Sequence, residues 1–335
     1  EIVQTYADEG KSGLRIDGDG FSARGRVALA FDDAGGKPSI DTVLAVDAGD
    51  IARARLYWPV NVMPAQTIAW LDKSLVAGRL DGGAVVIHGD LDDWPFREAR
   101  GRFEARAQVH DVDFDYHPRW PAARIGAADL EFGALGMAVN SDAIAVLGNQ
   151  ISLAPAAIDS FKDPIIDLHV EGGGSGPDLL ALLRASPVQD TTAGYLAGIS
   201  VGGRGEVAFD LRLPLRPDLG ESNLFGNVRL HDADLADHHW RLAFAQANGR
   251  LRFSNRGFAA DDLAVRVEGD PAALSIAIGE FATNAEHQIE ASLRGELPVT
   301  TVLAGVEGIA PLLPRAPGRS GWNVELAVDH ATDAV

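Results

Sequence analysis

The sequence predicts a mainly β protein built on an antiparallel sheet with one apolar face. Apolar and polar residues alternate along much of the chain, as in GEVAFDLRLPL, where Val207, Phe209 and Leu211 fall on one side. Turn signals such as DGDG, DDAGG, LDGG, ANG and SNRG separate these runs. Similar blocks of sequence recur at a long, fixed spacing, which indicates internal repeats of one structural unit.

The alternation defines the expected strands. In GRFEARAQV, Phe103 and Val109 share a side that excludes the charged residues between them. A strand places successive side chains on opposite faces of its sheet, so such a run fits a sheet with one apolar and one polar face. The clearest further runs are residues 165–170, 205–215, 263–267, 273–278, 288–293 and 322–328.

Three segments have helical spacing and are expected at the margin of the sheet. In the first, residues 63–79, Ile68, Leu71 and Leu75 share a face, with a proline near the start and a glycine near the end. In the second, residues 175–198, Ser186 and Gln189 fit a capping box. The EGGGSGPD sequence at its start favours a turn capped by Ser175 over an anion-binding loop. The third segment is residues 297–308.

The helical segments set the period of the repeat. They begin near Pro64, Pro177 and Pro298, which are 113 and 121 residues apart. The sequences VHDVDFD and LHDADLAD, which begin at Val109 and Leu230, are also 121 residues apart. Since no low-complexity linker separates the copies, we expect one continuous segment over residues 1–335. Its approximate repeats of about 115–120 residues cover 1–79, 80–198 and 199–310, with a further repeat starting at 311–335.

Composition excludes several classes of function. The formal net charge of −19 argues against nucleic acid, whose phosphates require a basic face, and against polybasic binding to anionic lipid headgroups. The absence of cysteine excludes thiolate metal sites and thiol nucleophiles. No apolar run reaches the roughly 18 residues of a membrane span. The first residue, Glu1, suggests a mature form or a piece of a longer chain.

The repeated His-Asp clusters raise the possibility of a metal-dependent hydrolase. Imidazoles and carboxylates are metal ligands, and residues two apart on a strand share a face. The same spacing is typical of a solvated strand face, and duplication of a structural unit copies its surface, so we favour the structural interpretation with no metal and no cofactor. The candidate ligands are His110, Asp111, Asp113, Asp115 and His117 in one cluster, and His231, Asp232, Asp234, Asp237, His238 and His239 in the other.

The apolar face of the predicted sheet has two possible uses. The sheet can close on itself as a structural or adhesive solenoid that buries the face in a core. It can also curl into a trough whose apolar interior stays open. A large exposed apolar surface of this kind marks a binding site. Periodicity alone leaves both possibilities open.

A resemblance to a known family favours the open trough. The stretch ARLYWPVNVMPAQTIAWLDKSLVAGRLDGGAVVIHGDLDDWPF, followed by GRFEARAQVHDVDFDYHPRWPAARIGAADLEF, resembles the YhdP family of AsmA-like proteins. The resembling elements are the P…WL…G helix, the G.L.D.PF…G.F.A strand pair and the Y.P.WP turn. SPVQDTTAGYLAGISVGGRGEVAFDLRLPL resembles the continuation. The family implies an elongated, twisted sheet curled into an open groove that carries lipid, and offers no catalytic motif.

The resemblance also implies a location and partners. It implies a periplasmic protein of Gram-negative bacteria, anchored to the inner membrane by a segment absent here. Such a protein carries phospholipid between the inner and outer membranes, supports outer-membrane lipid homeostasis and takes part in outer-membrane permeability. Its expected partners are phospholipid acyl chains and membrane proteins at the missing ends, with no catalysis. The expected groove lining is Phe103, Val109, Leu130, Phe132, Ile166, Leu168, Val170, Val207, Phe209, Leu211, Leu251, Phe253, Val265, Val267, Ile276, Ile278, Leu293, Val324 and Leu326.

Overall fold

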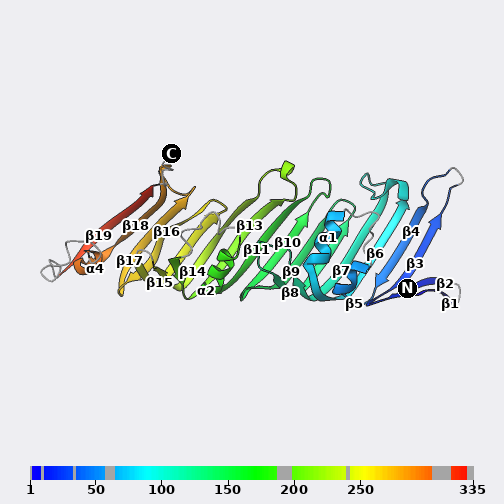
Figure 1. Ribbon diagram of the computed structural model, residues 1–335, viewed down its shortest axis with the longest axis horizontal. Coiled ribbons are helices and arrows are strands. Elements are labelled where there is room, and N and C mark those ends of the chain that lie inside the picture. Colours follow the sequence, from blue (N-terminus) through cyan, green and yellow to red (C-terminus); the bar gives the residue numbers. More distant parts are fainter. Residues whose placement is uncertain are drawn as a thin grey trace. The chain divides into compact units, whose positions relative to one another are not determined.

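The computed structural model describes residues 2–8, 11–32, 35–56, 65–186, 198–238, 242–303 and 318–329. Over these residues the chain is mainly β, with 19 strands assigned to one antiparallel sheet and a few short helices (Figure 1). The mainly β, antiparallel fold predicted from the alternation is therefore confirmed. Contacts divide the chain into two units: unit 1 comprises residues 1–146, 150–170 and 211–222, and unit 2 comprises residues 147–149, 171–210 and 223–335.

In unit 1, each strand pairs antiparallel with the next from β1 to β4, and from β6 to β9, while β4 pairs with β6 around the first helix. The strands are β1 (Ile2–Asp8), β2 (Lys11–Gly18), β3 (Phe21–Ala30), β4 (Ser39–Val46), β5 (Gly49–Asp50), β6 (Leu75–Asp90), β7 (Gly101–Phe114), β8 (Ala123–Gly133) and β9 (Met137–Val146). The helices are η1 (Ile51–Leu56), α1 (Ala65–Ser74), η2 (Leu91–Asp93) and η4 (Pro217–Leu219).

In unit 2, the strands from β14 to β19 pair antiparallel in chain order, and β12 also pairs with β14. The strands are β12 (Ile199–Val201), β14 (Asn223–Asp237), β15 (Leu242–Ser254), β16 (Gly257–Val267), β17 (Asp270–Gly279), β18 (His287–Pro298) and β19 (Arg319–Asp329), and the helices are α2 (Gly176–Arg184) and α4 (Val299–Leu303). Three strands contribute residues to both units: β10 (Asn149–Ile158), β11 (Ile165–Ser175) and β13 (Arg204–Pro214).

The sheet has an apolar face and a charged face in each unit. In unit 2, Leu274 of β17 lies opposite Leu293 of β18, which lies opposite Val324 of β19. Residues that oppose each other on antiparallel strands point to the same side, so these three share one face. The next residue on β18, Arg294, points to the other side, where it forms an ion pair with Asp262 of β16. We call these two sides the apolar face and the charged face.

The repeated His-Asp sequence lies at irregular positions of two long strands, β7 and β14. Asp111 and Asp232 have φ angles of +51° and +46°, which are uncommon for residues other than glycine. The register of β14 against β15 shifts between Leu230 and Ala233, on either side of this sequence. A bulge of this kind adds a residue to one strand and bends it. Leu230 and Ala233 therefore stay in one buried cluster although they are three residues apart.

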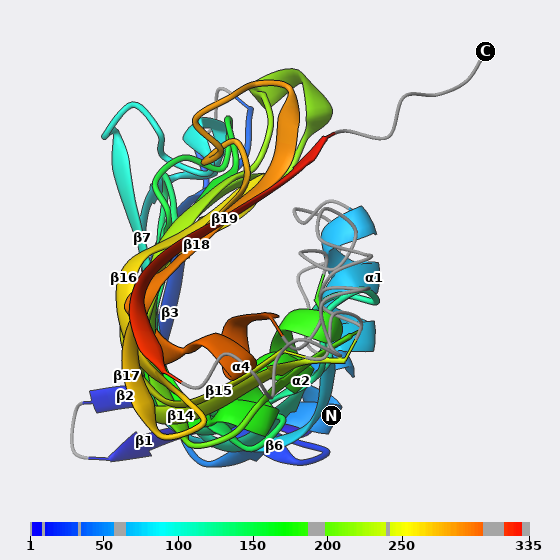
Figure 2. The ribbon, with the colours of Figure 1, turned by 90° about the vertical axis from the view of Figure 1, so that its left-hand side faces the viewer.

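The core of unit 2 is that cluster on the apolar face. Leu263 is 1% exposed and Val265 is 3% exposed. Gly249 makes room for Leu263: its φ is +146°, and a Cβ at this position would lie 2.6 Å from Leu263 Cδ2. Figure 2 shows β16, β17 and β18 curving strongly, with α4 on the concave side. The other members of the cluster are Leu230, Ala233, Ala247 and Ala260.

Two of the predicted turns are wrong. LDGG lies inside β6, and ANG lies inside β15. At both places the pairing register shifts, between Leu80 and Gly82 and between Ala245 and Asn248. Glycine in a strand interior often marks a bulge. At these two places the glycine-containing sequence therefore bends a long strand without ending it.

The predicted helices are present but shorter than their sequence patterns. The first, α1, ends at Ser74, and Leu75 begins β6. The second, α2, begins after Ser175, whose Oγ accepts a hydrogen bond from the Asp178 backbone N–H at 3.2 Å, so the capped turn is confirmed. The capping box at Ser186 and Gln189 and the second half of the third segment extend outside the described residues.

Candidate functional site

A row of opposing apolar residues crosses six neighbouring strands of unit 2. It runs across the strands from β14 to β19, so it follows the long direction of the sheet within this unit. A parallel row passes through the aromatic rings of Phe253 and Phe258 to Ile278 and Ile289. The first row consists of Val228, Leu251, Ala260, Ile276, Ala291 and Leu326.

Unit 1 has an equivalent row across six strands, β3, β4, β6, β7, β8 and β9. Leu130 and Val109 lie on the same face as this row, because they oppose Ala107 and Ala128 in the same register. Phe103 opposes Ile87 of β6, two positions along β7 from the row. Four predicted lining residues of β7 and β8 therefore share the apolar face. The row consists of Gly25, Leu44, Val85, Ala105, Phe132 and Met137.

Aromatic side chains cluster beside Phe103 on the apolar face of unit 1. The ring of Trp94 contacts the rings of Phe96 and Phe103, with centroids 5.4 and 5.2 Å apart. Phe96 is only 2% exposed and lies against the glycine pair of β6 and β7. A Cβ on Gly89 would lie 2.9 Å from Phe96 Cε1, and one on Gly101 would collide with the same ring. This packing gives a physical reason for the glycines near the DWPF sequence.

The predicted residues of β11 and β13 also point away from charged groups. In unit 1, Arg212 and Asp167 form an ion pair of 2.9 Å. By alternation Ile166, Leu168 and Leu211 point to the opposite side of their strands. In unit 2, the ring of Phe209 lies 6.4 Å from that of Phe253, and a Cβ on Gly226 would meet both rings. Val207 lies two residues before Phe209 on β13, so by the same alternation it shares the face of Phe209.

The exposure of the predicted lining is mixed. Val170, Val265 and Ile278 are at most 6% exposed, whereas Val324 and Leu326 of β19 are 38% and 41% exposed. The other fourteen predicted residues are partly buried. The apolar face is therefore covered in places and open to solvent in others. Val27 and Leu29 of β3, which sequence reasoning did not select, are also exposed on this face, because they oppose Thr42 and Ile40.

Short helices border the apolar face. In unit 2, a Cβ on Gly205 would lie 2.8 Å from Leu179 of α2 and 3.7 Å from Val228, so α2 lies against the apolar side. In unit 1, the ring of Trp70 on α1 packs edge-on against Phe114, with centroids 5.8 Å apart. The Trp70 Nε1–H donates to the Tyr116 carbonyl at 2.9 Å. Burial at this contact raises the pKa of Tyr116 to about 12.

Histidines of both His-Asp clusters lie beside carboxylates of neighbouring strands. The Nδ1 of His110 lies 2.7 Å from a carboxylate oxygen of Asp81 on β6, and the Nε2 of His231 lies 3.3 Å from one of Glu206 on β13. Within the part of the chain that the structure describes, which excludes His239, no three histidine, aspartate or glutamate side chains are grouped to hold a metal ion. In both strands the motif coincides with a shift of pairing register against one neighbouring strand, β6 for β7 and β15 for β14.

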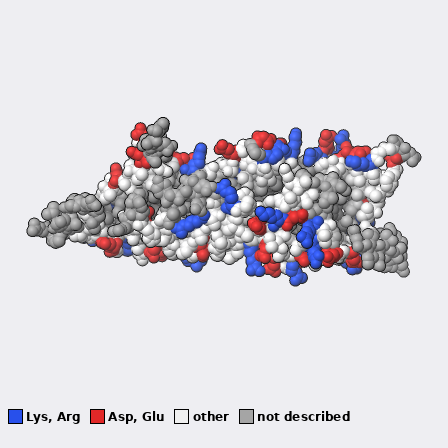
Figure 3. Space-filling view, in the orientation of Figure 1, with Lys and Arg blue, Asp and Glu red and all other residues white. Residues whose placement is uncertain are grey.

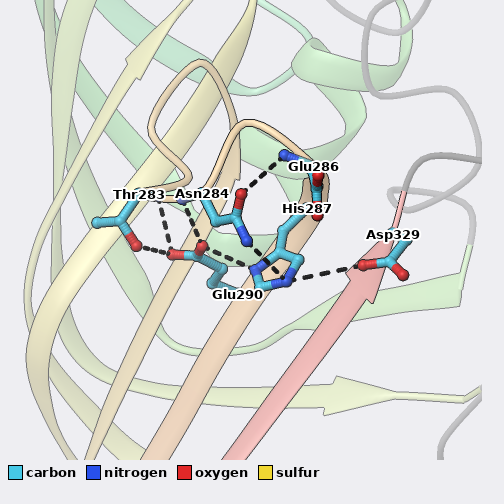
Figure 4. Close-up of polar contacts among 6 residues, drawn as sticks. All are labelled: Thr283, Asn284, Glu286, His287, Glu290 and Asp329. Atoms are coloured by element: carbon cyan, nitrogen blue, oxygen red, sulfur yellow. Dashed lines mark hydrogen bonds and ion pairs between the residues drawn. The ribbon is translucent and has the colours of Figure 1, made fainter.

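The charged face carries ordered polar contacts of its own (Figure 4). At the turn between β17 and β18, Glu290 accepts hydrogen bonds from the Thr283 and Asn284 backbone N–H groups at 2.9 and 2.8 Å, and its Oε1 lies 3.0 Å from His287 Nδ1. His287 Nε2 also lies 3.7 Å from Asp329 of β19. These contacts lower the pKa of Glu290 to about 2, with the Thr283 hydroxyl making the largest contribution. They fix this turn against the last two strands.

No helix in the described ranges has both the length and the apolar character needed to span a bilayer. The family model described as "YhdP protein" matches residues 6–335. The chain is 21% identical over 327 residues to a protein of Escherichia coli (strain K12) named "Intermembrane phospholipid transporter YhdP". This match covers 95% of the chain and 25% of the relative, so the chain spans about a quarter of that protein's length. No solved structure matches the chain.

Proposed function

Because the chain belongs to the YhdP family, and a relative is named an intermembrane phospholipid transporter, we propose that it carries phospholipid along the apolar faces of its sheet. In this proposal the chain is one segment of a periplasmic bridge between the inner and outer membranes. A segment outside this chain anchors the protein to the inner membrane, and proteins of both membranes meet its ends. The role is transport without catalysis.

The observation that carries the proposal is the pair of apolar rows, one in each unit, each of which crosses six strands. A row that crosses strands offers hydrocarbon from one strand to the next, so a bound acyl chain meets no charged side chain as it moves along the row. Leu326 at the β19 end of its row is 41% exposed. Partly exposed apolar residues in a continuous band mark a binding surface rather than a sealed core.

The energetics suit passive movement. Removing one CH₂ group from water is worth about 0.8 kcal/mol, and a hydrocarbon-lined surface offers an acyl chain much of what the bilayer interior offers. Successive apolar residues along a row are chemically similar. An acyl chain that leaves the residue of one strand therefore makes an equivalent apolar contact with the residue of the next strand. Headgroups stay in water at the opening of the curved sheet.

Site-specific photo-cross-linking tests the proposal. We expect benzoylphenylalanine at Phe132 and at Phe253, on the two apolar faces, to form adducts with phospholipid acyl chains in cells that express the chain. The same label at Ala45, which is exposed and opposes Arg24 on the charged face of unit 1, serves as the control. Lipid adducts at Ala45 that equal those at Phe132 and Phe253, or none at all three, would overturn the proposal.

A further inference from the structure

We propose that a cavity at the margin of unit 1 holds the phosphate of a phospholipid headgroup, an inference that rests on the proposed function. The cavity measures about 300 Å³ and lies where η1, α1 and the start of β6 meet. Its apolar wall consists of Ile51, Leu71, Leu75 and Val76. A pocket with hydrocarbon on one side and a few charged groups on the other suits an amphiphile.

Two cations line this cavity. Arg55 of η1 and Lys73 of α1 are both exposed, and neither forms an ion pair within the described ranges. Their neighbour Arg53, in contrast, pairs with Asp19 at 2.8 Å. Acidic residues outnumber basic ones 48 to 29 in this chain, yet neither cation of this cavity has a carboxylate partner among the described residues. Figure 3 shows Lys and Arg side chains beside acidic ones over the region of η1 and α1.

The cations of the cavity suit a phosphate group. Arg55 and Lys73 line it together with Asp72, which makes a further contact of its own. A phosphate diester carries a negative charge, and Arg and Lys are the side chains that bind phosphate oxygens. The chemistry recognised is therefore a phosphodiester next to hydrocarbon, which a phospholipid supplies.

The wall of the cavity and the apolar face meet at Gly78. Ile51 is 8% exposed and packs over Gly78, where a Cβ would lie 3.1 Å from Ile51 Cδ1 and 3.0 Å from Val112 Cγ2. Val112 follows Val109 across the His-Asp bulge of β7 and opposes Ile125 of β8. A lipid whose phosphate lies between Arg55 and Lys73 thus places its acyl chains toward the face that Val112 shares.

The second helix lacks this arrangement. At the end of α2, the guanidinium of Arg184 donates a hydrogen bond to the Ile199 carbonyl at 2.6 Å, so this cation is held by the backbone of unit 2. Arg55 and Lys73 have no such backbone or carboxylate contact in the described structure. The headgroup contact is therefore assigned to the margin at α1.

Calorimetry with short-chain lipids tests the assignment on the 335-residue chain. Dihexanoyl phosphatidylglycerol is the phosphodiester probe, dihexanoylglycerol is the same hydrocarbon without phosphate, and inorganic phosphate is the headgroup without hydrocarbon. We expect the Arg55→Gln/Lys73→Gln variant to bind the phospholipid about tenfold more weakly, the effect of losing two exposed charge-assisted contacts, with dihexanoylglycerol binding unchanged. The control Arg97→Gln/Lys162→Gln makes the same change in net charge at two exposed sites of unit 1 and should alter neither affinity.

The outcomes separate the two proposals. Equal phospholipid affinity in the double variant and its control would overturn the headgroup site while leaving transport along the apolar face intact. Inorganic phosphate that binds as tightly as the phospholipid, and is lost in the double variant, would replace the lipid assignment by a free-phosphate site. If the unaltered chain binds neither dihexanoylglycerol nor the phospholipid, the proposed function itself is contradicted.

Discussion

Replacing Phe132 by Asp places a carboxylate in the middle of the apolar face of unit 1. Phe132 lies between Ala105 of β7 and Met137 of β9, so its row offers the new charge no partner. A carboxylate surrounded by hydrocarbon costs about 3 kcal/mol on membrane-insertion scales. Since 1.36 kcal/mol is a factor of ten, we expect phospholipid to bind roughly 100-fold more weakly.

The fold should survive this substitution. Burying a phenylalanine side chain fully is worth about 1.5–3 kcal/mol, and Phe132 is only partly buried, so its loss costs about 1–2 kcal/mol. That is less than the 5–15 kcal/mol by which domains are stable. The assay is titration of a fluorescent phospholipid, with circular dichroism to verify folding. The matched control, Ala45→Asp, adds the same charge opposite Arg24 on the charged face and should bind normally. A folded Phe132→Asp variant with unchanged lipid affinity would refute the reasoning.

Three further predictions concern stability. Leu263→Ala should lower the unfolding free energy by about 2–5 kcal/mol, because Leu263 is 1% exposed, whereas Leu326→Ala, at 41% exposed, should cost under about 1 kcal/mol; urea titrations that give equal losses would contradict the described core. Gly101→Ala should displace the Phe96 ring and lower the melting temperature measured by calorimetry. An unchanged melting temperature would show that the ring does not lie against this glycine. The pKa of Glu290 falls from 4.5 to about 2 on folding, so its contribution is complete above pH 4.5 and is lost as the pH falls through about 2. Glu290→Gln should therefore flatten the pH dependence of stability between these values, and urea titrations with an unaltered slope there would argue against the turn contacts.

Much of the fold could be predicted because alternation is a local property of the sequence. The run from Val207 to Leu213 and the run from Phe103 to Val109 both form strands with the expected faces. The turn signals failed where glycine serves a bulge, as at Gly82 and Gly249, because a glycine in sequence does not reveal whether the strand resumes after it. That outcome depends on pairing with the neighbouring strand, which is a non-local interaction.

The His-Asp motif contained a signal that sequence reasoning missed. Apolar residues alternate at every second position up to Val109 and up to Leu230, and then resume three positions later at Val112 and Ala233. At the same motif in both strands the alternation of apolar residues changes phase. Each strand then needs a bulge at that point to keep its apolar residues on one face of the sheet. The motif was instead weighed mainly as a set of ligands or a solvated face.

The candidate lining could be selected from the sequence, but its exposure could not. Ile278 and Leu326 have the same pattern in their strands, yet they are 5% and 41% exposed. Exposure depends on how far the sheet curves and on which neighbouring strands cover each position. Arg55 and Lys73 were missed because they come from two separate helices, and only the folded chain brings them to one cavity.

Native mass spectrometry of the purified 335-residue chain tests the central claim most directly. If the apolar rows form a surface open to lipid, the chain should carry phospholipid from the cells that produced it, and the Phe132→Asp variant should carry much less while Ala45→Asp carries the same amount. A folded chain that emerges without any bound lipid, and takes up none when phospholipid is supplied, would show that the apolar face is a sealed core.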